Sequence, residues 1–160
     1  MFKPYIVIDR KVKERISINK KTNKEYKSIS FSTMALPLFN KWALLFYIID
    51  ENGNRKKRVC CNINKLLTRR GLAYWIMDDG SIGQSSKLKS KTGLHLNTYA
   101  FTYTDVLLLQ NVLNEKFNLK TSLHKHNSGY RIYIWERSMT HLKELVSEYI
   151  IDDMLYKISK

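Results

Sequence analysis

Two adjacent carboxylates, Asp78 and Asp79, stand directly before Gly80 at the end of an apolar stretch. Residues 66–81 predict one helix, because apolar side chains recur at helical spacing and few of them are β-branched. Gly80 then occupies the position at which many helices end in a left-handed residue. Anions at the C-terminal end of a helix meet its partial negative charge, which disfavours them. A hard divalent cation would relieve this repulsion by binding carboxylate oxygens, so the pair indicates a candidate metal site.

An ordinary turn is the alternative for the same three residues. In such a turn the Asp side chain bonds its own backbone and the glycine supplies a positive φ. The three residues alone favour the turn, whereas the apolar helix that precedes them favours the metal site.

The nine residues that end in this glycine, LAYWIMDDG, resemble the helix motif of the LAGLIDADG homing endonucleases. Five positions match that motif, namely Leu72, Ala73, Ile76, Asp79 and Gly80. The other four positions differ from it, namely Tyr74, Trp75, Met77 and Asp78. Three further segments resemble the intron-encoded endonuclease and maturase branch of the family, namely 94–98, 129–134 and 150–157. The resemblance therefore covers almost the whole chain.

Apolar and polar patterning predicts the elements that position this motif. Before the motif we expect strands over 5–18 and 25–33, a helix over 36–47, a basic turn over 50–58 and a short helix over 62–67. After the motif we expect a strand or arm over 81–91, a strand over 94–102 and a helix over 105–117 that is capped by Thr104. A hairpin of 119–125 with 130–135 follows. The chain then continues with a helix over 138–149 that is capped by Ser138, and with a closing segment over 150–157.

From residue 66 onward the expected order is αββαββα, which is the repeat unit of the family that the chain resembles. The resemblance implies an α+β, LAGLIDADG homing-endonuclease-like fold with an antiparallel saddle sheet in residues 66–160. Residues 1–65 look like a truncated first repeat, a basic ββα unit and loop that lacks its opening motif helix.

The charge of the chain indicates a polyanionic partner. The formal net charge is +14 and the isoelectric point is about 9.8. Residues 1–70 hold 17 Lys and Arg against 5 Asp and Glu, whereas residues 71–160 hold 11 against 9. Such asymmetry favours a nucleic-acid face over a generally basic surface. DNA and RNA, including intron or ribosomal RNA, both stay open as partners.

Basic side chains on strands and loops are the candidates for nucleic-acid binding. They are Lys11, Lys13, Arg15, Lys27, Arg55, Lys56, Lys57, Arg58, Lys87, Lys89, Lys91 and Arg131. The alternative for each is an ordinary solvated side chain.

Other patterns narrow the class of protein. Cys60 and Cys61 are adjacent and lack zinc spacing, so we expect reduced thiols. No apolar run approaches membrane-spanning length, and we expect no membrane partner. The Lys-, Asn-, Ile- and Tyr-rich composition suits an AT-rich organellar genome, so we expect a mitochondrial or other organellar protein.

The resemblance also implies roles for particular residues. Asp79 and Gly80 would bind the catalytic metal, Mg²⁺, and Asn97 and Lys125 would assist catalysis. Tyr99 stands where relatives carry a polar amide, which weakens the case for catalysis. Helix packing against a second motif would use Gly71, Leu72, Ala73 and Ile76. His124 and His126 share a strand face, but the sequence offers no third metal ligand beside them.

Family members are thought to pair two motif helices, so that one Asp acts on each strand. This chain contains one motif, and Asp78 cannot replace the missing partner because adjacent helical residues point about 100° apart. A dimer mate or a second polypeptide would complete an active, Mg²⁺-dependent DNA endonuclease. Otherwise the chain is degenerate and binds nucleic acid without cutting, or acts as a maturase or RNA-scaffold protein. We expect the non-cutting binder.

Overall fold

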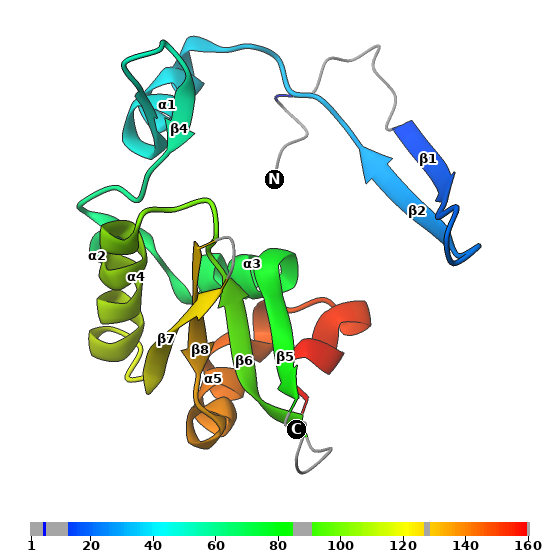
Figure 1. Ribbon diagram of the computed structural model, residues 1–160, viewed down its shortest axis with the longest axis vertical. Helices are drawn as coiled ribbons and strands as arrows, with labels where there is room; N and C mark the ends of the chain where they lie inside the picture. The colour runs from blue at the N-terminus through cyan, green and yellow to red at the C-terminus, as the bar shows by residue number, and fades with distance from the viewer. Residues whose placement is uncertain (1–4, 6–12, 85–90, 127–128, 160) are drawn as a thin grey trace. The chain divides into compact units, whose positions relative to one another are not determined.

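The structure is a computed structural model that describes residues 5, 13–84, 91–126 and 129–159. The chain divides into two compact units, Met1–Ala43 and Leu44–Lys160, and each is described by itself (Figure 1). The predicted boundary at residue 65 marks the start of a sequence repeat, not a division between compact units, and it stays a prediction.

The first unit contains an antiparallel hairpin of β1 (Lys13–Ile18) and β2 (Glu25–Ser30). Strand β2 is shorter than the predicted range of 25–33, and residues 6–12 of the first predicted strand lie outside the described residues. The turn between them depends on Asn19, whose backbone oxygen accepts from the Asn23 amide at 2.8 Å. Asn23 has a φ of 53°, a conformation that Asn tolerates better than most residues.

The register of this hairpin separates its side chains into two faces. Lys13 lies opposite Ser30 and Arg15 lies opposite Ser28, which gives a polar, basic face. Three isoleucines share the other face and are 60–70% exposed, namely Ile16, Ile18 and Ile29. Lys27 pairs with Ile16, so it lies on the isoleucine face and not beside Lys13 and Arg15.

The segment after this hairpin differs from the predicted long helix and basic turn. The observed elements are η2 (Pro37–Phe39), α1 (Asn40–Phe46), β3 (Tyr47–Ile49) and β4 (Arg55–Lys57). The predicted helix is shortened because Tyr47–Ile49, with its aromatic and β-branched side chains, suits a strand. Asp50 closes the β3–β4 turn by accepting from the backbone amides of Asn52 and Asn54 at 3.0 and 2.8 Å.

The remainder of the second unit confirms the predicted αββαββα order. Its elements are α2 (Ile63–Leu66), α3 (Arg69–Asp79), β5 (Gly80–Gln84), β6 (Lys91–Asn97), α4 (Tyr103–Glu115), β7 (Thr121–His126), β8 (Gly129–Ile134), η3 (Glu136–Ser138), α5 (Met139–Val146), η4 (Ser147–Tyr149) and η5 (Asp152–Lys157). Strands β5, β6, β8 and β7 form one antiparallel sheet in that order (Figure 1). The α+β fold class is therefore confirmed.

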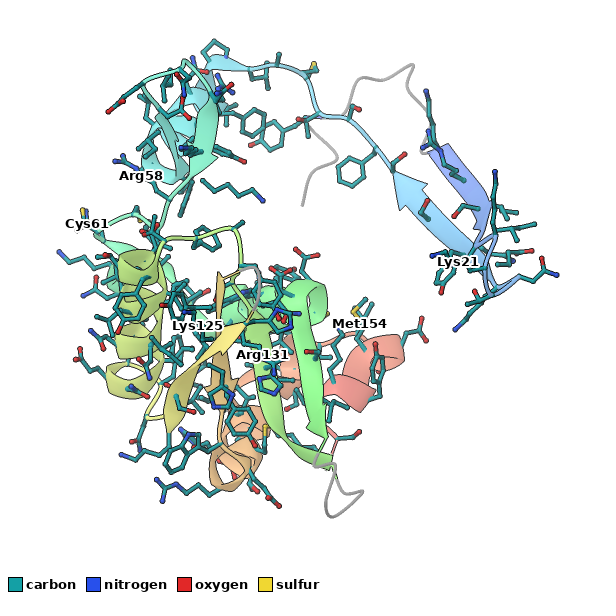
Figure 2. The ribbon with its side chains drawn as sticks, viewed as in Figure 1. Lys21, Arg58, Cys61, Lys125, Arg131 and Met154 are labelled. Carbon is teal, nitrogen blue, oxygen red and sulfur yellow. The ribbon has the colours of Figure 1, made fainter. Side chains whose placement is uncertain are left out.

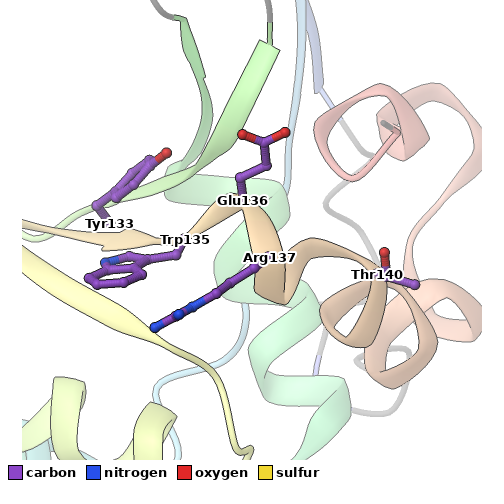
Figure 3. A pocket seen from close by; sticks show the side chains of 5 residues that line it. All are labelled: Tyr133, Trp135, Glu136, Arg137 and Thr140. Atoms are coloured by element: carbon purple, nitrogen blue, oxygen red, sulfur yellow. The ribbon is translucent and has the colours of Figure 1, made fainter.

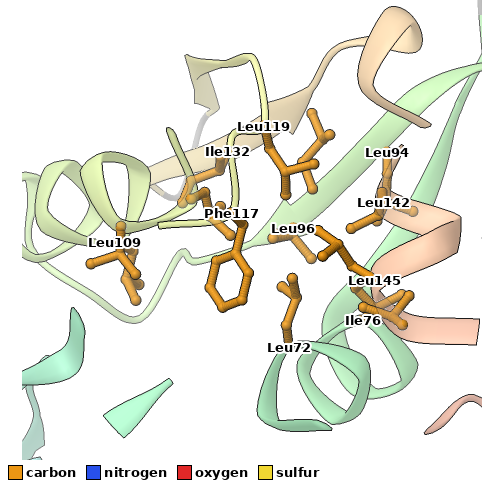
Figure 4. Close-up of a cluster of buried hydrophobic side chains, with 14 of the residues drawn as sticks. Leu72, Ile76, Leu94, Leu96, Leu109, Phe117, Leu119, Ile132, Leu142 and Leu145 are labelled. Atoms are coloured by element: carbon orange, nitrogen blue, oxygen red, sulfur yellow. The ribbon is translucent and has the colours of Figure 1, made fainter. Parts of the chain in front are cut away.

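One face of this sheet carries the hydrophobic core. Alternate residues of the two central strands point to the helices and are fully buried, namely Leu94, Leu96, Ile132 and Ile134. Helix α3 packs on β5, β6 and α5, and α4 packs on β7 and β8. Leu72 and Ile76 of α3 complete this core (Figure 4). Because period-two alternation buries one face, the opposite face of the sheet is left with polar side chains.

Helix ends differ from the predictions in three places. Thr68 caps α3, since its Oγ1 accepts from the Gly71 amide at 3.1 Å, and this cap separates α3 from α2. Thr102, not Thr104, caps α4. Ser138 occupies the N-cap position of α5, but its hydroxyl accepts from the Lys120 amide at 2.8 Å and makes no capping bond.

Within the described residues, no helix combines the length and the apolar character needed to cross a membrane.

Candidate metal and nucleic-acid site

The motif helix ends at Asp79, and the chain continues directly into β5 at Gly80. The prediction that Gly80 is left-handed is wrong, because its φ is −74° and its backbone is extended. A Cβ at this position would overlap the backbone oxygen of Ile76. Glycine is therefore required here for the close approach of two backbone segments.

Two neighbours fix the backbone at the end of α3. The Asn97 side-chain amide donates to the backbone oxygen of Asp79 at 3.0 Å, which ties the helix end to β6. The Lys157 ammonium donates to the backbone oxygens of Ile76 and Met77. Asn97 thus lies beside Asp79, and its catalytic role stays a prediction, whereas Lys157 has no counterpart among the predicted site residues.

The electrostatics of this helix end differ from those of a surface carboxylate. Burial raises the pKa of Asp79, and the charge of Asp78 raises it further. The positive charges of Lys57 and Lys157 act in the opposite direction. The local environment therefore disfavours a second negative charge, as the sequence pattern indicated.

Asp79 is exposed overall, and one side of it lines an apolar cavity of about 200 Å³. It is lined by Phe46, Arg58, Val59, Ile63, Leu67, Trp75, Asp79, Phe101 and Leu109. Most of these side chains are hydrocarbon, so water around the carboxylate is reduced on that side.

The donor atoms at the end of α3 fit part of a Mg²⁺ site. Mg²⁺ prefers oxygen ligands and is usually bound by one or two carboxylates together with substrate phosphates and water. Asp79 offers the carboxylate, and Gly80 is buried and could offer only its backbone oxygen. Among the described residues, no three His, Cys, Asp or Glu side chains cluster as a complete metal site.

The predicted helix-packing residues lie mostly on the inner side of α3. Leu72, Ala73 and Ile76 are fully buried within this chain, so they contact its own core and cannot also face a second motif helix. A Cβ on Gly71 would lie 3.4 Å from a Leu67 side-chain carbon. Tyr74, which departs from the family motif, is 52% exposed and marks the open side of α3.

Lys125 does not share a sheet face with Asn97. The pairing of β7 with β8 places Lys125 on the side of Leu123, opposite that of His124. Asn97 pairs with Arg131, which pairs in turn with His124. The structure therefore brings Asn97, but not Lys125, to the open face, and a catalytic role for Lys125 stays a prediction.

The open sheet face carries a cluster of aromatic rings. The His124 and Tyr133 rings stack with centroids 5.1 Å apart, and the His95 ring lies 4.8 Å from Tyr133 and 5.6 Å from His124. Ser122 Oγ lies 3.1 Å from His124 Nε2. Register, not sequence proximity, assembles this cluster, because it joins three strands.

Both histidines of this cluster have pKa values below the ordinary value for histidine. Burial lowers the pKa of His95 to about 4, with contributions from Arg131 and His124. Burial and Arg131 also lower the pKa of His124. His95 Nδ1 and Arg131 Nε are buried and have no hydrogen-bond partner among the residues that the structure describes. Figure 2 labels Arg131 on this sheet.

A tryptophan and an arginine extend the open face at the end of β8. The Trp135 indole N–H donates to Ser122 Oγ at 3.1 Å, and the Arg137 guanidinium lies 4.4 Å from the Trp135 ring centroid. These two residues line a surface hollow of about 610 Å³ together with Tyr133, Glu136 and Thr140 (Figure 3). The alternation of residues 130–135 was the sequence signal for this face, and Arg131 was its predicted binding residue, whereas Trp135 and Arg137 were not predicted.

The other predicted basic residues lie in several places. Lys13, Arg15 and Lys27 are exposed on the β1–β2 hairpin. Lys11, Lys87 and Lys89 lie outside the described residues, and Lys91 is the first residue of β6. Within the hairpin, Lys27 lies on the face opposite Lys13 and Arg15.

The basic run 55–58 forms a strand and its continuation, not a turn. Arg55, Lys56 and Lys57 are exposed on β4, and Lys56 pairs with Asp50 at 3.1 Å. Arg58 donates to the backbone oxygens of Leu44 and Leu45 at 2.7 and 3.1 Å. The Arg58 guanidinium therefore stabilises the fold of the chain itself through these two hydrogen bonds.

Comparison with known proteins places this architecture in one family. Residues 1–142 match the LAGLIDADG DNA endonuclease family. The chain is 35% identical over 134 residues to the cytochrome b mRNA maturase bI2 of Saccharomyces cerevisiae, and this match covers 81% of this chain and 30% of the maturase. It is 31% identical over 152 residues to the DNA endonuclease I-ChuI of Chlamydomonas applanata, covering 91% of this chain and 68% of that protein.

A solved structure agrees with these matches. The homing endonuclease I-WcaI bound to its DNA recognition sequence superposes with a TM-score of 0.80 at 31% identity, covering 99% of this chain and 67% of that one. The chain therefore spans about a third of the yeast maturase and about two thirds of I-ChuI and I-WcaI. The motif helix, the antiparallel sheet and these relatives together show that the chain belongs to the LAGLIDADG DNA endonuclease family.

Proposed function

We propose that this chain binds duplex DNA through the open face of the β5–β6–β8–β7 sheet and does not cut DNA by itself. The observation that carries the proposal is that face, where Asn97, His124 and Arg131 lie in one row across three strands. A two-stranded β-ribbon fits the major groove, and side chains on it reach base edges. The similarity to I-WcaI, whose structure is bound to its DNA recognition sequence, supports the same assignment.

The absence of cutting follows from the number of acidic helix ends. Cleavage of both strands by paired motif helices requires one Asp at each of two helix ends, and this chain offers Asp79 on α3. Asp78 is also exposed, but its side chain points about 100° around the helix from that of Asp79. A second end must come from another copy of the chain or another polypeptide segment.

A completed endonuclease is the second candidate function, and two features favour it. The backbone oxygen of Asp79 accepts from the Asn97 side-chain amide, so one of the two acidic helix ends is already held in place. The hairpin face with Ile16, Ile18 and Ile29 is mostly exposed, and a two-stranded hairpin alone is marginally stable in water. We propose that a further LAGLIDADG segment covers this face.

In the completed site, bound Mg²⁺ would polarise the phosphate and activate water. Asp79 would hold the metal through its carboxylate, and Gly80 through its backbone oxygen. Asn97 would fix the backbone that carries Asp79, and Arg131 would compensate phosphate charge. RNA is the alternative partner, because some relatives are mRNA maturases. The Lys-, Asn-, Ile- and Tyr-rich composition supports an organellar location.

The test is binding by the purified chain to a randomised DNA duplex library and to structured RNA, across a salt titration. We expect duplex DNA affinity that falls steeply with salt, and an Arg131→Gln variant weaker by about tenfold. Lys143→Gln, on the exposed side of α5, is the matched control and should bind normally. Preferential RNA binding would favour the maturase function, and salt-independent binding would overturn both. Mg²⁺-dependent cleavage by the chain alone, lost in Asp79→Asn, would overturn the non-cutting assignment.

A further inference from the structure

The charges on the motif helix are reversed relative to its dipole. Arg69 and Arg70 lie in the first turn, where the helix end is partially positive, and Asp78 and Asp79 lie in the last turn, where it is partially negative. Each charge is therefore at the less favourable end. Within α3 itself there is no acidic residue in the first turn and no basic residue in the last. Compensation must come from elsewhere in the chain.

Lys157 supplies compensation at the acidic end. The last four backbone carbonyls of an α-helix have no hydrogen-bond donor within the helix, so donors must come from elsewhere. Ile76 O accepts from the Gly80 amide and, at 3.3 Å, from the Lys157 ammonium. Met77 O also accepts from Lys157, and Asp79 O accepts from Asn97. Two distant side chains thus satisfy three carbonyls of this turn.

The segment that carries Lys157 also reaches the other end of α3. The Arg70 guanidinium lies 5.3 Å from the centroid of the Tyr149 ring in η4, a cation–π distance. Both η4 and η5 pack on α3. Residues 147–157 therefore contact α3 near both of its ends, although 67 residues separate the two segments in sequence.

We propose that Lys157 is a positioning residue for Asp79, which fixes the last turn of α3 and compensates the negative charge gathered there. Lys157 does not touch the carboxylate in any contact described above; it acts through the carbonyls of Ile76 and Met77. Its value for cleavage rests on the proposed endonuclease function, but its effect on the helix end does not. The position of Asp79 would then depend on Lys157, a side chain of η5 at the end of the fold.

The experiment compares amide hydrogen exchange in the unaltered chain and in Lys157→Met, which keeps an unbranched apolar stem and removes the charge and the donors. We expect the Gly80 amide, which bonds Ile76 O, to exchange about fivefold faster, because a cation at a helix C-terminus stabilises the last turn. Amides in α4 should be unchanged. The Asn97 side-chain amide signal should shift, since it bonds the same turn.

Lys157→Arg and Lys143→Met distinguish positioning from general stability. Arginine restores charge and donors, so exchange at Gly80 should return to within about twofold of the original, and Lys143→Met should have no effect. Equal acceleration of Gly80 and α4 amides in Lys157→Met would mean a general structural role and overturn the proposal, as would no acceleration at all. Failure of nucleic-acid binding would not alter these rates, so the two proposals fail separately.

Discussion

The β1–β2 hairpin and the β5–β6–β8–β7 sheet have the same alternation of apolar and polar side chains, but they differ in what covers the apolar face. In the sheet, Leu96 and Ile132 are fully buried beneath helices. In the hairpin, Ile16 and Ile29 are 62% and 70% exposed. The same local pattern thus gives a buried core in one unit and, in the other, an exposed face on which isoleucines alternate with charged side chains such as Lys27. Alternation specifies which side chains share a face, and tertiary partners decide whether that face is buried.

The largest expected difference between the two regions is in stability. Leu96→Ala should reduce the free energy of unfolding by about 2–5 kcal/mol, because it leaves a cavity in a packed core. Ile16→Ala should change it by no more than about 0.5 kcal/mol in the free chain. Urea unfolding followed by circular dichroism measures both. An equal loss in the two variants would show that the isoleucine face is covered within the free chain.

The second difference is the pH dependence that the sheet should have and the hairpin should not. The pKa of His95 is lowered to about 4 by burial, from 6.5 in an unfolded chain. The unfolded state therefore binds more protons between these values, so stability should be full above pH 6.5 and decline as the pH falls toward 4. Thermal unfolding midpoints at pH 7, 6 and 5 should show this decline.

His95→Gln should flatten the decline in the unfolding midpoint between pH 7 and pH 5. A decline of the same size in this variant and in the unaltered chain would assign the pH dependence to other groups.

The smallest expected effect distinguishes the two faces of the hairpin. Lys13→Ala should weaken nucleic-acid binding a few-fold and reduce the slope of log affinity against log salt by about one, because one phosphate contact is lost. Lys27→Ala should leave both unchanged, since Lys27 lies on the isoleucine face and only 3.8 Å from Glu25. A filter-binding salt titration of both variants is sufficient. A larger loss for Lys27 would reverse the assignment of the faces.

Local signals in the sequence determined much of the fold. The spacing of apolar residues and the absence of strong helix breakers placed the motif helix, and alternation placed five of the strands near their observed positions. The misplaced basic turn at 55–58 shows the limit of such signals. Short strands such as Tyr47–Ile49 are difficult to separate from the end of an apolar helix, because three residues do not define a period.

The sequence by itself determined that an acidic helix end, Asp79, would be followed by strands, since local periodicity encodes both, and the resemblance to the family implied that these strands form an antiparallel sheet. Only the tertiary structure decided which side chains surround that end. Lys157 reaches Met77 across 80 residues, and His95 meets His124 and Tyr133 only when three strands pair in one register. Gly80 is required by the nearby Ile76 carbonyl, not by a positive φ. Contacts between distant segments depend on register and packing, which no local pattern specifies.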